Sequence, residues 1–313
     1  MSQWVRTFIS GLLISVALLG PSHTTALKAT MHTPYFTVHY DPADSYLAES
    51  AAEAAADELK RIAKDLGYKL EPDRPIPLMV YRTHYSFTQE GGHKDRYVVG
   101  TARTGDERIS VDASGAFVAM KTVMAHEITH AVIFRILKDK SHTLPLWVNE
   151  GLAKFESEPY PDADNALVAD AAADGALIPL AKLHTSFPDR RTDLAYAQSA
   201  SAIRFMVKHH GKSAPKALLS ELASSGSFDK ALHAATGKIE KEFTAEWVDS
   251  IGRKFRVLRA WRIVSAFGGS VMAFLAILAF AIRRRRMAQA AREWEWEEFD
   301  DSMSRQLRDW PHR

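Results

Sequence analysis

Two histidines, four residues apart in a continuous helical pattern, constrain this chain more than any other feature. His126 and His130 lie in the segment HEITH, and the run from Met120 through Leu137 contains no Gly or Pro, which favours one uninterrupted helix. Residues four apart project from the same face of an α-helix, where two imidazoles can bind one metal ion. The pattern therefore predicts a metal site, against the alternative of an ordinary buried helix with two incidental histidines.

A third ligand is expected from the segment WVNEGLAKF, which we assign to a second, short helix. Glu150 lies in this segment, twenty positions after His130. A catalytic zinc site needs three nitrogen or oxygen ligands and an open position for water. Glu127 follows the first histidine directly, where it can reach that water without binding the metal. This layout predicts a metal-activated hydrolase with Glu127 as general base.

The two segments together resemble the gluzincin zinc metallopeptidases, and the chain is similar to the peptidase MA-like domains. The resemblance implies an α+β, zincin-like domain in which a small mixed sheet and a helical lobe flank the active-site cleft. It also implies Zn²⁺ as the cofactor, a peptide or protein as the substrate, and His126, His130 and Glu150 as the metal ligands.

A transition-state stabiliser is also implied by the resemblance, since relatives carry a Tyr or His for the oxyanion on the helical lobe. Tyr196 is the preferred candidate because it begins the first helix expected after the two metal-binding segments, and His209 and His210 are rivals. Each has a plainer interpretation: Tyr196 as a core aromatic residue, and the two histidines as groups that favour a helix C-terminus.

Three residues near Glu150 define the expected surroundings of the metal. Thermolysin-like sequences carry an Asp four residues after the ligand Glu, whereas this chain has Lys154. Glu156 is a possible substitute as the partner of a ligand histidine, or simply an exposed acid. Asn149 is expected to bind backbone near the cleft.

Substrate recognition departs from that of the membrane alanyl aminopeptidases. Their Gly-x-Met-Glu-Asn stretch, whose Glu binds the substrate amino terminus, has no counterpart between residues 85 and 120. Capture of a free amine is therefore not expected. The strand predicted at Arg108–Asp112 could instead pair with an extended peptide by strand addition.

The remaining elements follow from alternation, helical periodicity and Gly or Pro boundaries. Strands are expected at Tyr35–Tyr40 and Ile76–Tyr81, and a hairpin from Tyr97–Ala102 and Arg108–Asp112. Helices are expected at Asp44–Leu66, Ala116–Lys138, Asp193–His210, Pro215–Ala223, Phe228–Ala235 and Lys238–Phe255, with a loop at Asp139–Pro145.

Two apolar segments predict membrane targeting. Residues 1–26 resemble a signal peptide, with Arg6 before an apolar core and small residues at its end; an uncleaved anchor is the alternative. Residues 263–282 carry no charge, and twenty helical residues cover about 30 Å of hydrocarbon. We expect an extracytoplasmic domain at 27–258, a transmembrane helix at 263–282 and a cytoplasmic tail at 283–313.

Orientation is decided by the signal rather than by charge, because basic residues flank both ends of the span. Arg283–Arg286 follow it, and five Arg or Lys residues between 253 and 262 precede it. The expected location is thus a cell membrane, single-pass, with the large domain periplasmic or extracellular. The acidic and aromatic tail at 293–298 is either a solvated helix or a docking site for a partner.

The net charge and the absence of cysteine argue against several classes of function. The net charge is +2, so no overall attraction to nucleic acid is expected. The chain has no Cys, which excludes thiol catalysis, disulfides and cysteine-based zinc sites. Against the leading hypothesis of a membrane-anchored zinc metallopeptidase stand a catalytically silent zincin-fold binding or scaffold module and a transmembrane signalling protein. Substrate, cleavage preference and oligomeric state stay open.

Overall fold

A computed structural model describes residues 27–90, 99–102, 107–115, 117–158, 162–252 and 273–287. The chain divides into two compact units, one with residues up to 168 and from 176 to 245, and one with residues 169–175 and from 246 onward. The predicted signal peptide lies outside the described residues, as do residues 263–272 of the predicted span and 288–313 of the tail. Within the described ranges, no helix is both long enough and apolar enough to cross a membrane.

A five-stranded mixed sheet forms one part of the first unit. Its strands are β1 (Ala29–His32), β2 (Phe36–Tyr40), β3 (Ile76–Tyr81), β4 (Gly100–Ala102) and β5 (Ile109–Asp112), in the order β1-β2-β3-β5-β4. The two inner pairs, β2–β3 and β3–β5, are parallel, and both outer pairs are antiparallel. The predicted strands and the β4–β5 hairpin are confirmed, while β1 was not foreseen.

The sheet order corrects one prediction. β5 is hydrogen-bonded to β3 on one side and to β4 on the other, so its backbone groups are already paired. Pairing of a peptide with Arg108–Asp112 by strand addition is therefore wrong. Among the described strands, β4 forms that edge of the sheet.

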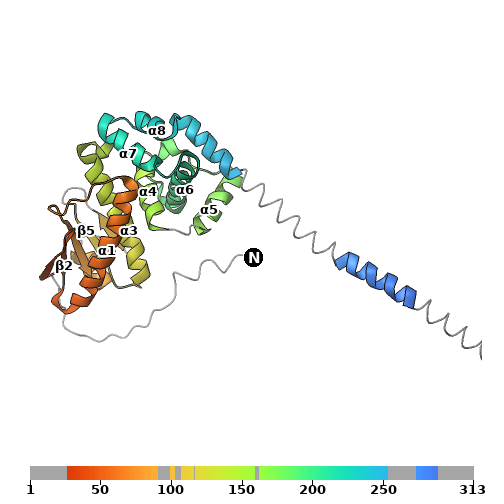
Figure 1. The fold of residues 1–313 in the computed structure, drawn as a ribbon, viewed down its shortest axis with the longest axis horizontal. Helices are drawn as coiled ribbons and strands as arrows, with labels where there is room; N and C mark the ends of the chain where they lie inside the picture. The colour runs from red at the N-terminus through yellow and green to blue at the C-terminus, as the bar shows by residue number, and fades with distance from the viewer. Residues whose placement is uncertain are drawn as a thin grey trace, which may run out of the picture. The chain divides into compact units, whose positions relative to one another are not determined.

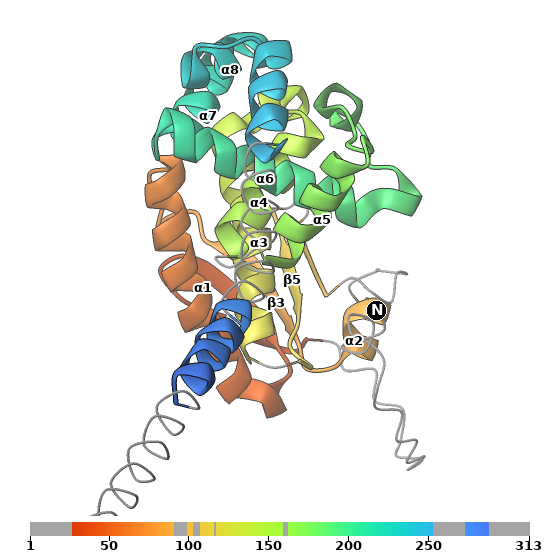
Figure 2. The same ribbon diagram turned by 90° about the vertical axis from the view of Figure 1, so that its right-hand side faces the viewer.

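Two long helices cover one face of the sheet (Figures 1 and 2). Helix α1 (Ser45–Leu66) contacts β2 and β3, and α3 (Phe117–Leu137) contacts β4 and β5. The sequence ends α1 at Gly67, whose φ of 75° is readily adopted only by glycine and lets its N–H cap the carbonyl of Ala63. The short helix α2 (His84–Glu90) contacts β3 and β5.

The rest of the first unit is helical. Its elements include η2 (Lys138–Thr143), α4 (Leu146–Ser157), the first part of α5 (Asp162–Ala173), α6 (Thr192–His210), α7 (Ala214–Ser225) and α8 (Phe228–Thr236), and residues 240–245 are also helical. The helical residues 169–173 and 246–252 belong to the second unit. Helix α4 packs against both α3 and α6. Trp147 of α4 is fully buried and stacks on Phe243 at a centroid distance of 6.1 Å, which fixes α4 in the apolar core of this helical part.

The described fold is thus α+β, with a small mixed sheet and a helical part, as the sequence predicted. Helix α5 was not predicted from the sequence. Its Asp-rich start and Ala-rich body show almost no segregation of apolar residues to one face. The predicted loop at Asp139–Pro145 is largely a 3-10 helix, η2.

Candidate metal centre

The two histidines of HEITH lie side by side on α3, as their spacing predicts. The ring centroids of His126 and His130 are 4.8 Å apart, and the ring planes are nearly perpendicular at 83°. His130 is buried and His126 is partly exposed. The His130 ring is therefore held in the protein interior, while the His126 ring borders solvent.

Glu150 of α4 faces both imidazoles. Its Oε2 atom lies 3.4 Å from Nε2 of His126 and 3.6 Å from Nε2 of His130. One ligand atom from each of the three residues can be chosen so that all lie within 4.8 Å of one another. Packing of α3 against α4 thus brings together residues that are far from adjacent in sequence.

The chemistry of this donor set fits a divalent cation. Oε2 of Glu150 is buried and has no hydrogen-bond partner among the described residues, although a buried carboxylate oxygen without one is costly. Burial alone would raise the pKa of Glu150, but its interactions with His126 and His130 outweigh burial and lower the pKa to about 2. A carboxylate held ionised between two imidazole nitrogens matches the nitrogen and oxygen ligands that zinc prefers.

Asn149 orients the second histidine. Nδ1 of His130 lies 3.1 Å from Oδ1 of Asn149, so the ring donates from Nδ1 and leaves Nε2 directed at Glu150. Asn149 was expected to bind backbone, whereas the contact that the structure gives its side-chain carbonyl is with His130. Burial would lower the pKa of His130, but Glu150, Glu127 and Asn149 raise it to about 8.

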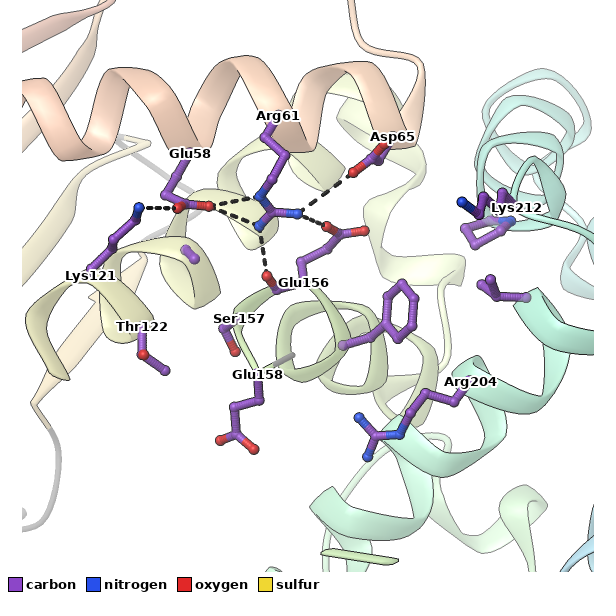
Figure 3. A pocket seen from close by; sticks show the side chains of 14 residues that line it. Glu58, Arg61, Asp65, Lys121, Thr122, Glu156, Ser157, Glu158, Arg204 and Lys212 are labelled. Atoms are coloured by element: carbon purple, nitrogen blue, oxygen red, sulfur yellow. Dashed lines mark hydrogen bonds and ion pairs between the residues drawn. The ribbon is translucent and has the colours of Figure 1, made fainter. Parts of the chain in front are cut away.

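Two other residues near Glu150 turn away from the centre. Glu156 accepts from Nη1 of Arg61 on α1 at 2.5 Å (Figure 3), so the prediction that it supports a ligand histidine is wrong. Lys154 forms ion pairs with Glu158 at 2.8 Å and with Asp164 at 3.5 Å. These acids hold the ammonium group that stands where thermolysin-like sequences have an Asp.

Glu127 is buried beneath the edge strand β4. A Cβ atom on Gly100 would lie 2.2 Å from Val123 Cγ1 and 3.1 Å from Oε1 of Glu127, so the strand approaches α3 as closely as its backbone allows. Burial raises the pKa of Glu127, against the lowering effects of His130, of His126 and of a backbone hydrogen bond from Ala102. The carboxylate is thereby suited to accept a proton. Gly100 was missed in the sequence, where a lone glycine gives no such signal.

Tyr196 lies in the second turn of α6 and is electrostatically coupled to the centre. Burial raises its pKa to about 12, and the charges of Glu150 and Glu127 add to that shift. The ring packs edge-on against Phe187 at 5.0 Å. Helix α6 is the second α-helix after Glu150 rather than the first, because α5 intervenes.

The rival histidines lie at the other end of the same helix. Thirteen residues of α-helix rise about 20 Å, which separates His209 from Tyr196. His209 packs on Phe205 at 4.5 Å, and His210 packs on Phe205 and Phe243. Their position in the last turn of α6 agrees with the plainer, helix-terminal interpretation.

Comparison with known proteins finds a family and a solved structure to which the chain is similar. A family model described as the Peptidase MA superfamily matches residues 54–252, which is more than half of the chain. Among solved structures, a variant of an M1 zinc metallopeptidase from Deinococcus radiodurans is 16% identical with a TM-score of 0.39. The match covers 70% of this chain and 50% of that one, so the chain spans about half the length of that structure. No protein with a curated description matches the sequence.

Proposed function

This chain belongs to the peptidase MA superfamily, and from that premise we propose that it is a membrane-anchored, zinc-dependent metallopeptidase of the HExxH type. The observation that carries the proposal is the buried Oε2 atom of Glu150, which faces two imidazole nitrogens and has no hydrogen-bond partner among the described residues. A cation between the three side chains would satisfy it.

The residues of the centre have three proposed roles, which are metal binding, proton transfer and stabilisation of the oxyanion. A zinc ion held by His126, His130 and Glu150 would activate a water molecule and polarise the carbonyl of the scissile bond. Glu127 accepts the proton of the attacking water on a carboxylate oxygen and delivers it to the leaving amine nitrogen. The Tyr196 hydroxyl, which burial keeps protonated, donates to the oxyanion of the transition state.

The edge strand β4 supports an extended peptide as the substrate. It ends the strand order of the described sheet, and Gly100 in it lies against Glu127. A peptide that pairs with this edge would gain main-chain hydrogen bonds. Its backbone would then pass close to the general base, which is what hydrolysis of an internal peptide bond requires.

Location is proposed from the sequence alone. The export signal at 1–26 and the apolar segment 263–282 support a single-pass protein with its large domain outside the cytoplasm. Substrates would then be peptides or proteins of the periplasm or the cell exterior.

The experiment compares the wild-type full chain, purified in detergent, with Glu127→Gln. Both are incubated with a peptide library, and new peptide termini are read by mass spectrometry. Gln keeps the size of the side chain and its ability to accept a hydrogen bond, but it cannot take the proton. We expect zinc content to be unchanged and the rate of cleavage to fall by about 10²–10⁴.

Glu53→Gln is the matched control, since Glu53 is an exposed carboxylate on α1, and it should cleave at the wild-type rate. If the zinc-loaded wild-type protein releases no more termini than Glu127→Gln, the peptidase proposal fails. A catalytically silent binding module would then be the better interpretation.

A further inference from the structure

A pocket of 730 Å³ lies where α1, α3, α4, α6 and α7 meet (Figure 3). Its volume is in the range of small-molecule sites, which is roughly 300–1,000 Å³. The pocket is distinct from the candidate metal centre, because His126, His130 and Glu150 are not among its lining residues. Nothing in the proposed peptidase chemistry uses it.

The charges on the α1 side of the pocket neutralise one another. Arg61 donates to the Glu156 carboxylate at 2.5 Å, to the Glu156 carbonyl at 2.6 Å and to Glu58 at 2.9 Å. Lys121 of α3 pairs with the other oxygen of Glu58 at 3.2 Å. These groups form a connected network that fixes the C-terminal end of α4 to α1.

The guanidinium of Arg204 on the α6 side is not neutralised in this way. Its only ion pair among the described residues is a long one, 3.5 Å from Nη2 to Asp164, and Lys154 shares that carboxylate. Its Nε and Nη1 atoms are buried, and within the described part of the chain they have no hydrogen-bond partner. Buried N–H groups on a charged side chain are costly to leave unpaired.

From these contacts we infer that the pocket binds a small monocarboxylate with an apolar stem, and that Arg204 is its anchor. The Nε and Nη1 atoms of Arg204 have almost no accessible surface in this structure, so the side chain, which is 20% exposed, would have to turn toward the pocket for the carboxylate to reach them. The exposed Lys212 at the same pocket would add positive charge. Val207, Pro215 and Phe155 line the pocket beside them and would contact the stem.

A single negative charge fits this pocket better than a phosphate. Four acidic residues also line it, namely Glu58, Asp65, Glu156 and Glu158. They balance the four basic residues of the lining, which are Arg61, Lys121, Arg204 and Lys212, so the pocket has no excess of positive charge to hold a dianion. A peptide C-terminus and an acylated amino acid both have the required chemistry.

The test is calorimetric titration of the chelator-treated full chain in detergent, at constant ionic strength, with N-acetyl-leucine. We expect saturable binding with a Kd below about 10 mM. N-acetyl-leucinamide, which replaces the carboxylate with a neutral amide, should bind the wild type about tenfold to a hundredfold more weakly. N-acetyl-leucine should bind the Arg204→Met variant more weakly than the wild type by a similar factor. Asp164 keeps Lys154 as a partner in that variant.

Arg190→Met serves as the control, because Arg190 is exposed on η4 (Asp189–Arg191) and does not line the pocket. This variant should bind N-acetyl-leucine with the same affinity as the wild type. Equal binding of acid and amide by the wild type would overturn the inference, even if Arg204→Met proved unstable. So would an absence of saturable binding, or phosphate binding as tightly as N-acetyl-leucine. Binding that survives Arg204→Met but is lost in Glu150→Ala would place the ligand at the metal centre instead.

Discussion

Asn149 accepts a hydrogen bond from Nδ1 of His130 at 3.1 Å, and the next residue along α4, Glu150, faces Nε2 of the same ring. Two consecutive residues of one helix thus contact the two nitrogens of one imidazole on another helix. This arrangement sets both the tautomer and the direction of the ring, and metal-binding histidines commonly depend on such a partner.

Asn149→Leu should weaken zinc binding by about 10–100-fold, because His130 would lose the acceptor that orients it. Asn149→Asp is the matched control, since its carboxylate still accepts from Nδ1. Competition with a fluorescent zinc chelator measures both affinities. Equal zinc affinity in the wild type and Asn149→Leu would contradict the orienting role.

Removal of any one candidate ligand should abolish stoichiometric zinc. His126→Ala, His130→Ala and Glu150→Ala each leave only two donors, and catalytic zinc sites use three protein ligands. Metal analysis of the purified full chain should find about one zinc per wild-type molecule and much less in each variant. Full occupancy in all three variants would rule out this centre.

Tyr196→Phe should lower kcat by about 10²–10³ and leave zinc content unchanged, because only the hydroxyl that donates to the oxyanion is removed. The ring contact with Phe187 is retained, so the melting temperature should change little. Steady-state kinetics on a peptide found in the library screen provides the measurement. A kcat close to that of the wild type would assign the oxyanion to another donor.

Gly151→Ala should destabilise the protein, although alanine is the better helix former by about 1 kcal/mol. The added Cβ would lie 2.7 Å from the Ser199 carbonyl oxygen and 2.9 Å from Ile203 Cγ1. Helices α4 and α6 would have to separate, at a cost of about 1–3 kcal/mol. Thermal unfolding followed by circular dichroism measures the loss. Gly115→Ala, whose Cβ would meet nothing within 4 Å, should unfold at the wild-type temperature.

Protease added to intact spheroplasts should digest the large domain and spare an epitope fused after Arg313, if residues 1–26 are an export signal and the apolar segment 263–282 stops transfer, as we propose. Immunoblots against the domain and the epitope read the result. Digestion of the epitope with the domain protected would reverse the orientation.

Local periodicity allowed several features to be predicted from the sequence. The shared face of His126 and His130 needs only the 3.6-residue repeat of one helix. The bounds of β3 and the end of α1 at Gly67 also follow from short-range patterns, because alternation and a glycine with positive φ act within a few residues.

The contacts of Glu150, Asn149 and Glu156 could not be predicted in this way, because they depend on how α1, α3, α4 and α6 pack together. Glu150 was expected as the third ligand from the chemistry of zinc sites and from the family resemblance, and the α3–α4 packing supplies the geometry. From the sequence, Asn149 was expected to bind backbone and Glu156 was one possible partner of a ligand histidine, because residue type alone does not show which side chain reaches the ring. Asn149 and Glu156 lie seven residues, or about two turns, apart on α4, so Glu156 is about 10 Å further along the helix. There it meets Arg61 of α1, whereas Asn149 stays beside His130. Long-range packing, not residue type, assigned these two roles.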